Sequence, residues 1–174
     1  MIPQHLSLTN EHFTPSNVIE AARATLGEID LDPASCPEAN LHVQACRYFT
    51  QEYDGLAHEW SGRVFLNPPG GIVYGEVRKK WDTRSSACAW WRKLVSEIAA
   101  GRVPAAVFVG FTLEILRTTQ GFGWLSALSF PLCVPAERLP FSGPDPTHAN
   151  VIVYVGMFPE RFRAAFSAIG EVRL

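Results

Sequence analysis

Long hydrophobic runs are missing from this sequence. No apolar stretch among its 174 residues approaches the roughly 20 consecutive apolar residues that cross a membrane. The first five residues also hold no basic segment of the kind that begins an export signal. A hydrophobic fraction of 47% with 18% charged residues is that of an ordinary globular protein and argues against a disordered chain. We therefore expect one soluble domain over residues 1–174, in the cytoplasm and without a membrane partner.

Cysteine is scarce, and no two cysteines form a CxxC pair. The chain holds four of them, Cys36, Cys46, Cys88 and Cys133. His42 and His58 lie near the first two in sequence, but the spacing fits no common set of zinc ligands. We therefore expect reduced thiols, as in a cytosolic protein, and no metal site.

Charge is nearly balanced overall but unevenly placed. The net charge is −2, yet residues 1–60 carry nine acidic side chains against two arginines. Residues 78–93 carry six basic side chains against one aspartate. This basic window indicates either a surface for a polyanionic partner or a solvated loop, and the sequence leaves both interpretations open.

Helical and extended patterns alternate along the chain. Apolar residues recur at helical spacing between Thr14-Pro15, which suit a helix start, and Gly27, which ends the helix. Further helices are expected within 33–53 and over 90–101, 111–120 and 159–169. Strands are expected over 28–31, 48–49, 63–66, 105–109, 130–134 and 150–155. Residues 1–12 have the pattern of a loose arm, and residues 70–86 that of an exposed basic loop.

This alternation predicts a doubly wound α/β sheet of the Rossmann type. Ligands of such sheets bind beyond the carboxyl ends of the strands. Asp32 and Asn67 each follow a predicted strand, so we expect both at that edge. Because too few residues separate them for two full strand–helix units, we also expect the first half of the sheet to be trimmed.

The tripeptide Asn67-Pro68-Pro69 follows the apolar run 64–66 directly. Pro68 forces Asn67 out of the helical region, and Pro69 does the same to Pro68. A carboxamide oxygen and a rigid backbone carbonyl then point away from the strand end. Together they can accept both hydrogens of an exocyclic amino group. A plain loop is the alternative, because Pro-Pro after a strand is common.

Other motifs occur in a fixed order around this tripeptide. They are Thr14-Pro15-Ser16-Asn17-Val18-Ile19, Asp30-Leu31-Asp32-Pro33-Ala34-Ser35, Glu38-Ala39-Asn40, Tyr48-Phe49-Thr50, Asp54-Gly55-Leu56 with Trp60, and Phe65-Leu66-Asn67-Pro68-Pro69. The ordered set resembles the phage-type DNA N6-adenine methyltransferases, small enzymes that use S-adenosylmethionine and are often encoded by bacteriophages and prophages. The match is dense over residues 12–75. It is thinner afterwards, where Trp90-Trp91, Arg138 and Phe141 also look similar to the family.

The resemblance implies S-adenosylmethionine as cofactor and DNA as partner, without an obligate protein partner, in a bacterial host or a phage-infected cell. It implies that Asn67, Pro68 and Pro69 hold the amino group of a flipped adenine. The cofactor-binding residues that it implies are Thr14, Pro15, Asp32, Pro33, Ala34, Asn40, Asp54 and Gly55. The DNA-binding residues expected with it are Tyr74, Arg78, Lys79, Lys80, Arg84, Arg138 and Phe141. Plainer interpretations stay open, since Asp32-Pro33 and Asp54-Gly55 are also turn sequences and Thr14 is also a helix cap.

The sequence departs from the family in two places. No glycine occurs in residues 32–37, although the usual cofactor-binding sheet has a glycine-rich loop there that lets the backbone approach its ligand. Gly70-Gly71 follow Asn-Pro-Pro, where many of these enzymes have Tyr or Phe. A base must leave the duplex and stack on a ring, and such stacking contributes about 1–3 kcal/mol. The candidates for a replacement ring are Tyr74, Trp90, Trp91 and Phe141.

Three functions therefore remain open at this point. The first is methylation of adenine N6 in DNA. The second is methylation of another planar amine or amide, such as cytosine N4 or a glutamine side chain, because Asn-Pro-Pro serves those reactions too. The third is a non-catalytic relic that binds S-adenosylmethionine or DNA, which the glycine at position 70 favours.

Overall fold

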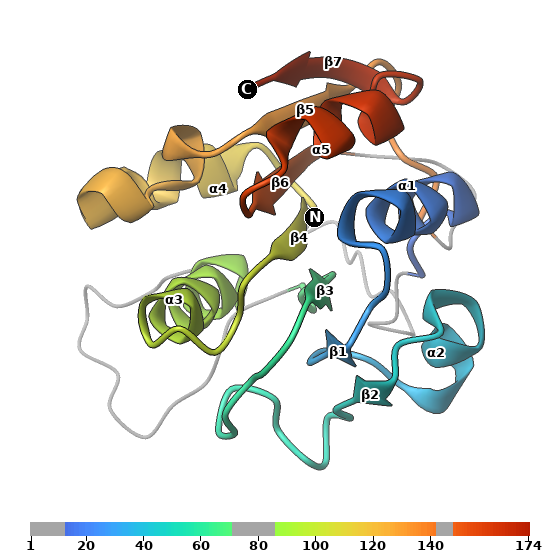
Figure 1. Cartoon of the computed structure of the whole chain (residues 1–174), viewed down its shortest axis with the longest axis vertical. Helices are drawn as coiled ribbons and strands as arrows, with labels where there is room; N and C mark the ends of the chain where they lie inside the picture. Colours follow the sequence, from blue (N-terminus) through green and yellow to red (C-terminus); the bar gives the residue numbers. More distant parts are fainter. Residues whose placement is uncertain (1–12, 71–85, 142–147) are drawn as a thin grey trace, which may run out of the picture.

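The structure, a computed structural model, describes residues 13–70, 86–141 and 148–174. These residues form helices on both sides of a seven-stranded sheet (Figure 1). The α-helices are α1 (Ser16–Leu26), α2 (Pro37–Val43), α3 (Ser86–Ala99), α4 (Glu114–Thr118) and α5 (Pro159–Phe166). Two 3₁₀ helices, η1 (Gln120–Leu125) and η2 (Ala127–Ser129), follow α4. The strands are β1 (Leu31–Asp32), β2 (Arg47–Tyr48), β3 (Val64–Leu66), β4 (Ala106–Gly110), β5 (Leu132–Pro135), β6 (Val151–Val155) and β7 (Gly170–Arg173).

The sheet has the strand order β2-β1-β3-β4-β6-β5-β7. Strands β1 to β4 run parallel to one another. Strand β6 is antiparallel to both of its neighbours, β4 and β5, and β7 is antiparallel to β5. From β1 the chain moves outward to β2 and then returns to the other side of β1 to form β3. The strand order therefore reverses between β1 and β3, and such switch points are where doubly wound sheets bind their ligands.

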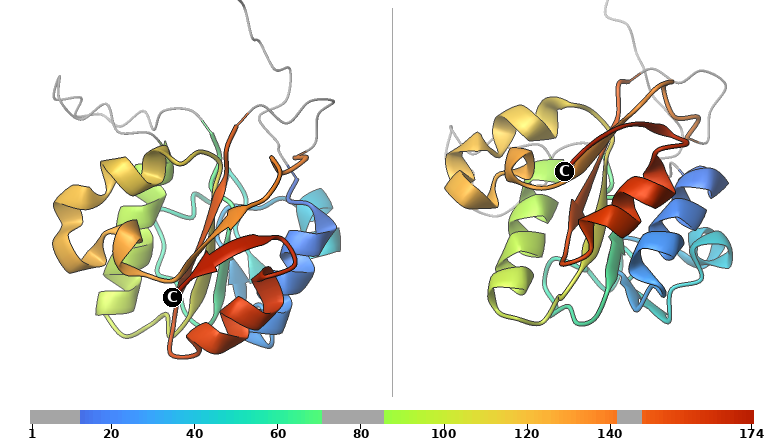
Figure 2. Two further views of the ribbon diagram at one scale, coloured as in Figure 1. Left: turned by 90° about the horizontal axis from the view of Figure 1, so that it is seen from above. Right: turned by 45° about the horizontal axis from the view of Figure 1, so that its top comes forward.

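Helices cover both faces of the sheet (Figure 2). The sheet thereby separates two layers of apolar core, one on each face. On one face α1 packs beside α5, and their buried side chains include Val18 and Phe162. On the other face Trp91 and Leu94 of α3 pack over Phe108 of β4. Strands β4 and β6 are buried along their whole length because both of their faces are covered.

The structure confirms the predicted α/β class and the trimmed first half of the sheet. Only α2 and β2 lie between β1 and β3. The strands predicted over 63–66, 105–109 and 150–155 appear as β3, β4 and β6 with bounds shifted by at most one residue. Within the described ranges, no helix is both long and apolar enough to span a membrane.

Two local predictions were wrong, and one strand was missed. Helix α1 begins at Ser16, and Pro15 occupies the capping position with no side-chain cap, so Thr14 does not cap the helix. The helix predicted over 111–120 shrinks to the five residues of α4, since η1 takes over at its end and Gly123 has a non-helical backbone. Strand β7 was not predicted, because only alternate residues of this strand are half-buried and its pairing with β5 is decided by the tertiary fold.

Candidate functional site

The residues predicted to bind ligands gather at one edge of the parallel strands. Asp32 is the last residue of β1, and Asn67 directly follows β3. Because β1, β3 and β4 are parallel, their carboxyl ends point the same way. The strand pairing therefore brings Asp32 and Asn67 to the same edge, as the sequence predicts.

Asp32 is a buried carboxylic acid at the end of β1. Its side chain is only 3% exposed, and within the described ranges no Lys, Arg or His forms an ion pair with it. Burial raises the pKa of Asp32 to about 7, although the backbone N–H of Ala34, 3.2 Å from Oδ1, favours the charged form. The Ser35 hydroxyl acts in the same direction, yet its buried oxygen completes no hydrogen bond of normal geometry with the described residues. A buried carboxylate that forms no ion pair within the described ranges is suited to a cationic ligand.

The Asp54-Gly55 turn lies against the segment that follows Asp32. A methyl group on Gly55 would stand 2.0 Å from the carbonyl oxygen of Pro33, so only glycine permits this contact. The indole N–H of Trp60 also contacts this turn, by donating a hydrogen bond to the Gly55 carbonyl at 2.7 Å. Two predicted cofactor segments, Asp32-Pro33-Ala34 and Asp54-Gly55, are thus brought together.

Asp54 is shaped by this turn. Its backbone lies in the left-handed region with φ of 53°, which few residues other than glycine adopt without strain. Its Oδ1 accepts the backbone N–H of Leu56 at 3.1 Å. The carboxyl group is exposed and retains further lone pairs for a ligand.

The Asn67-Pro68-Pro69 segment leaves the sheet directly from β3. Asn67 is half-buried, Pro68 is buried, and Pro69 is exposed. Gly70 is exposed as well, and a side chain at this position would meet no described atom within 4 Å. A side chain at position 70 would therefore begin without a clash against the described residues. The extended geometry expected from the two prolines stays a prediction.

Asn40 has a structural role in the fold. Its Oδ1 accepts the backbone N–H of Ala45 at 2.9 Å, and its Nδ2 donates to the carbonyl of Ala45 at 3.3 Å. These two bonds close the connection from α2 to β2, in which Gln44 has φ of 53°. Asn40 thus holds this connection, and its role toward the cofactor stays a prediction.

Thr14 and Pro15 lie half-buried at the start of α1. The carbonyl of Pro15 accepts the N–H groups of Val18 and Ile19 at 3.0 and 3.2 Å. These contacts anchor the first turn of the helix. A role for Thr14-Pro15 over the cofactor stays a prediction.

The prediction of Phe141 as a DNA-binding residue was wrong. Phe141 is 6% exposed and packs against Phe111, with 5.4 Å between the ring centres. Arg138, in the same loop, is exposed. The other predicted DNA-binding residues, Tyr74, Arg78, Lys79, Lys80 and Arg84, lie outside the described residues.

Trp90 and Trp91 are also excluded as the ring that stacks a flipped base. Trp90 is 6% exposed and stacks on Trp60, and Trp91 is fully buried between Phe108 and Phe130. Both indoles therefore belong to the core beneath α3.

Arg92 and Lys93, at the end of the basic window, both contact side chains of the protein itself. Lys93 forms an ion pair of 2.5 Å with Glu97, which is 1% exposed. The Arg92 guanidinium lies 5.6 Å from the centre of the Phe122 ring. The charge of Lys93 is thus used within the fold. A surface for a polyanionic partner would depend on residues 78–84.

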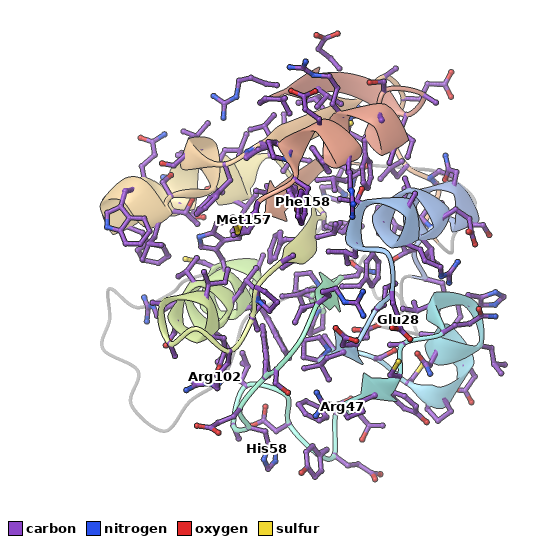
Figure 3. All side chains as sticks on the ribbon, viewed as in Figure 1. Glu28, Arg47, His58, Arg102, Met157 and Phe158 are labelled. Atoms are coloured by element: carbon purple, nitrogen blue, oxygen red, sulfur yellow. The ribbon has the colours of Figure 1, made fainter. Side chains whose placement is uncertain are left out.

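Among the described residues, three side chains of types that bind metal ions lie close together, just before the amino ends of β1 and β2. Ligand atoms of Glu28, Asp30 and Cys46 lie within 4.8 Å of one another. Arg63 occupies this position instead, with its guanidinium 2.7 Å from Asp30 and 2.8 Å from Glu28. Its hydrogen bond lowers the pKa of Asp30. Glu28 lies beside β1 in Figure 3, and the group acts as an ion-pair network that joins β1 to β3.

Two residues of this edge received no role from the sequence. Trp60 appears in the ordered motifs, but its buried N–H and its contact with Gly55 depend on the folded turn. Asn150 is 3% exposed and joins two chain segments, accepting from Leu139 N–H at 2.9 Å and donating to the Phe111 carbonyl at 2.8 Å. An Asn before an apolar strand is too common to reveal this role.

Comparisons with known proteins give one structural likeness. No protein-family model matches the chain, and no curated protein sequence matches it. Among solved structures it is similar to a Listeria monocytogenes protein that is provisionally assigned as a class I S-adenosylmethionine-dependent methyltransferase. The TM-score is 0.51 with 11% sequence identity, over 87% of this chain and 62% of that protein. The chain thus spans less than two thirds of its neighbour and shares its Rossmann-like fold.

Proposed function

We propose that this protein is an S-adenosylmethionine-dependent methyltransferase that acts on adenine N6 in DNA. The observation that carries the proposal is the position of Asn67-Pro68-Pro69. It leaves β3 at the edge where the buried Asp32 and the Asp54-Gly55 turn also lie. The motif order supports the substrate, and the Listeria neighbour supports the methyltransferase class.

The chemistry of this edge fits the proposed cofactor. S-adenosylmethionine supplies an electrophilic methyl group on a sulfonium cation. The buried Asp32 carboxyl, which lacks a basic partner among the described residues, is suited to the positive charges of this ligand. Asp54, exposed on a turn that contacts Pro33, is suited to hydroxyl or amino donors.

Asn67 and Pro68 would act on the other substrate. The lone pair of the adenine amino group is delocalised into the ring, so the amine is a poor nucleophile. Oδ1 of Asn67 and the carbonyl of Pro68 would accept its two N–H groups, which localises the lone pair and aims it. Positioning of this kind contributes several kcal/mol. The amine proton leaves to solvent, and no metal ion is needed.

DNA contacts remain part of the proposal. Tyr74 is the remaining candidate, among those named, for the ring that stacks the flipped base. Arg78, Lys79, Lys80 and Arg84 would contact phosphates, which set affinity without reading sequence. Replacing Lys79, Lys80 and Arg84 with Ala should weaken binding equally across DNA sequences. It should also reduce the salt slope by about 0.9 for each lost phosphate contact. An unchanged slope would mean that these residues do not contact DNA and that the DNA-binding surface lies near Arg138.

The test is incubation of the protein with labelled S-adenosylmethionine and DNA of mixed sequence, followed by nucleoside analysis. N6-methyladenine is the expected product, and the Asn67→Ala variant is the matched control. N4-methylcytosine, or label only in added glutamine-containing peptides, would assign another amine or amide as substrate. Calorimetric binding of the cofactor without transfer to any of these would identify a non-catalytic relic, which the glycine at position 70 favours.

A further inference from the structure

Trp60 is buried beneath the proposed cofactor edge and touches it through one hydrogen bond. Its side chain is 0% exposed, and its indole N–H donates to the carbonyl of Gly55 at 2.7 Å. The ring stacks on Trp90 of α3 with 5.9 Å between centres and 22° between planes. The Lys93 ammonium lies 5.8 Å from the ring centre. Helix α3 thereby fixes the position of the indole donor.

The turn that Trp60 holds is in an unusual conformation. Asp54 has a positive φ, and the next residue, Gly55, is in contact with the backbone of Pro33. Within the turn, the Ala57 N–H donates to the Asp54 carbonyl at 2.9 Å, and the Leu56 N–H donates to its carboxylate. These bonds are local and do not join the turn to the sheet. The Trp60 bond joins the turn to an indole that stacks on α3. A Cβ on Gly55 would also lie 3.1 Å from the Trp90 ring of that helix.

The segment around Trp60 is linked through Arg102 to Glu97, a buried carboxylate of α3. Glu97 binds Lys93 and Arg102 at 2.5 Å each, and Arg102 also lies 3.6 Å from Glu59. The N–H of Gly62 donates to the Arg102 carbonyl at 3.0 Å. Both sides of Trp60 are therefore tied to the end of the helix, so the indole is a fixed support for the turn.

We propose that Trp60 is a positioning residue that sets the Asp54-Gly55 turn against Pro33 and thereby shapes the cofactor site. Trp60 does not touch the ligand in this arrangement. It acts through the Gly55 carbonyl and the carboxylate of Asp54. The inference rests on the proposed function only where it takes S-adenosylmethionine as the ligand, and its structural part is tested without ligand.

Trp60→Phe tests the proposal, because it removes the N–H donor and keeps an aromatic ring. Trp91→Phe is the matched control. Trp91 is also fully buried, donates its N–H to the Leu125 carbonyl at 2.9 Å, and packs away from the turn. Both variants should lose similar thermal stability. Only Trp60→Phe should weaken binding of S-adenosylmethionine, by roughly five- to tenfold for one lost buried hydrogen bond. Equal losses of affinity in the two variants would overturn the proposal.

A double-mutant cycle separates positioning from general damage. In an Asp54→Ala background, Trp60→Phe should change cofactor affinity by less than about twofold, since its effect passes through Asp54. Additive losses would show that Trp60 acts elsewhere and would overturn the assignment. Gly55→Ala is the second variant if Trp60→Phe does not fold, because its methyl group would push the turn off Pro33 and should produce the same loss.

Amide hydrogen exchange tests the turn itself. Trp60→Phe should speed exchange at the amides of Leu56 and Ala57 at least about tenfold, and Trp91→Phe should leave these two amides unchanged. Unchanged exchange in Trp60→Phe would overturn the positioning role. If the wild-type protein binds no S-adenosylmethionine, the proposed function fails, and the exchange data still decide whether Trp60 fixes the turn.

Discussion

The two halves of the sheet are built in different ways. Strands β4 and β6 have five buried residues each and pair along their whole length. Strands β1, β2 and β3 have two, two and three residues. The first half (β2-β1-β3) has short backbone ladders, to which Arg63 adds a side-chain link with Asp30. Side-chain bonds from Asn40 to Ala45 and from Trp60 to Gly55 close its connections. The second half (β4-β6-β5-β7) depends on a backbone ladder and an apolar core.

The difference shows where this fold places its strained turns and its buried carboxyl group. Among the described residues, the non-glycine positions with positive φ are Gln44 and Asp54, and both lie in the first half. The buried carboxyl of Asp32, which forms no ion pair with the described residues, lies there too. Such features cost stability and persist only where surrounding contacts hold them in place.

Phe162→Ala should have the largest effect on stability. Phe162 is fully buried in the core under α5, and removing such a ring costs about 3–5 kcal/mol in the free energy of unfolding. Phe158→Ala is the control, because Phe158 is 55% exposed (Figure 3) and its loss should cost about 0.5 kcal/mol or less. Chemical denaturation measures both. Equal costs would contradict a core that holds the second half together.

Asn67→Ala should remove methyl transfer and leave cofactor affinity within a few-fold. Loss of one preorganised polar group at a reacting centre costs roughly 100- to 1,000-fold in kcat. Asn150→Ala is the counterpart in the second half, since its amide joins Phe111 to Leu139. It should cost about 2–3 kcal/mol in stability with kcat per folded molecule nearly retained. Wild-type turnover in Asn67→Ala would remove this residue from the reaction.

Asp32→Asn should stabilise the ligand-free protein at high pH and weaken cofactor binding. Burial raises the pKa of Asp32 from its ordinary 3.8 to about 7. The folded protein therefore binds this proton more tightly than the unfolded chain. The stability from that proton is fully present below about pH 4 and is lost as the pH rises through about 7.

The stability difference between Asp32→Asn and the wild type should therefore depend on pH. At pH 8 the variant should be more stable by on the order of 2–4 kcal/mol, and near pH 4 the two should be similar. Thermal unfolding across this range measures the difference. Wild-type affinity for S-adenosylmethionine should rise from pH 5.5 to 8, and the variant should lose this rise. A constant stability difference at every pH would contradict a buried, titrating Asp32.

Gly70→Tyr should have the smallest effect of these variants, and it should increase the binding or methylation of DNA. A side chain at position 70 meets no described atom within 4 Å, and the backbone there is not in the left-handed region. A ring at this position would stack the flipped base, which is worth about 1–3 kcal/mol. Methylation or binding of DNA with a mismatched adenine should therefore improve roughly tenfold, as measured by competition with Gly70→Ala. An equal result for the two variants would mean that another ring already stacks the base.

Local patterns revealed part of the site because they depend on neighbouring residues. Asn67 could be placed at a strand end from an apolar run and two prolines, whose steric effect needs no tertiary contact. Asn40 and Phe141 matched the same family pattern, but the fold uses Asn40 to close a loop and buries Phe141 against Phe111. Sequence alone does not distinguish an amide that binds ligand from one that binds backbone.

The sequence by itself determined the alternation of strands and helices and the strand-end positions of Asp32 and Asn67. Those features follow from hydrophobic periodicity and proline sterics, which act over a few residues. Only the tertiary structure decided that Gly55 contacts Pro33, that Trp60 holds this turn, and that Asp32 loses its water. These facts depend on residues that are distant in sequence meeting in a packed interior, where burial shifts a pKa and the absence of a Cβ permits a backbone contact.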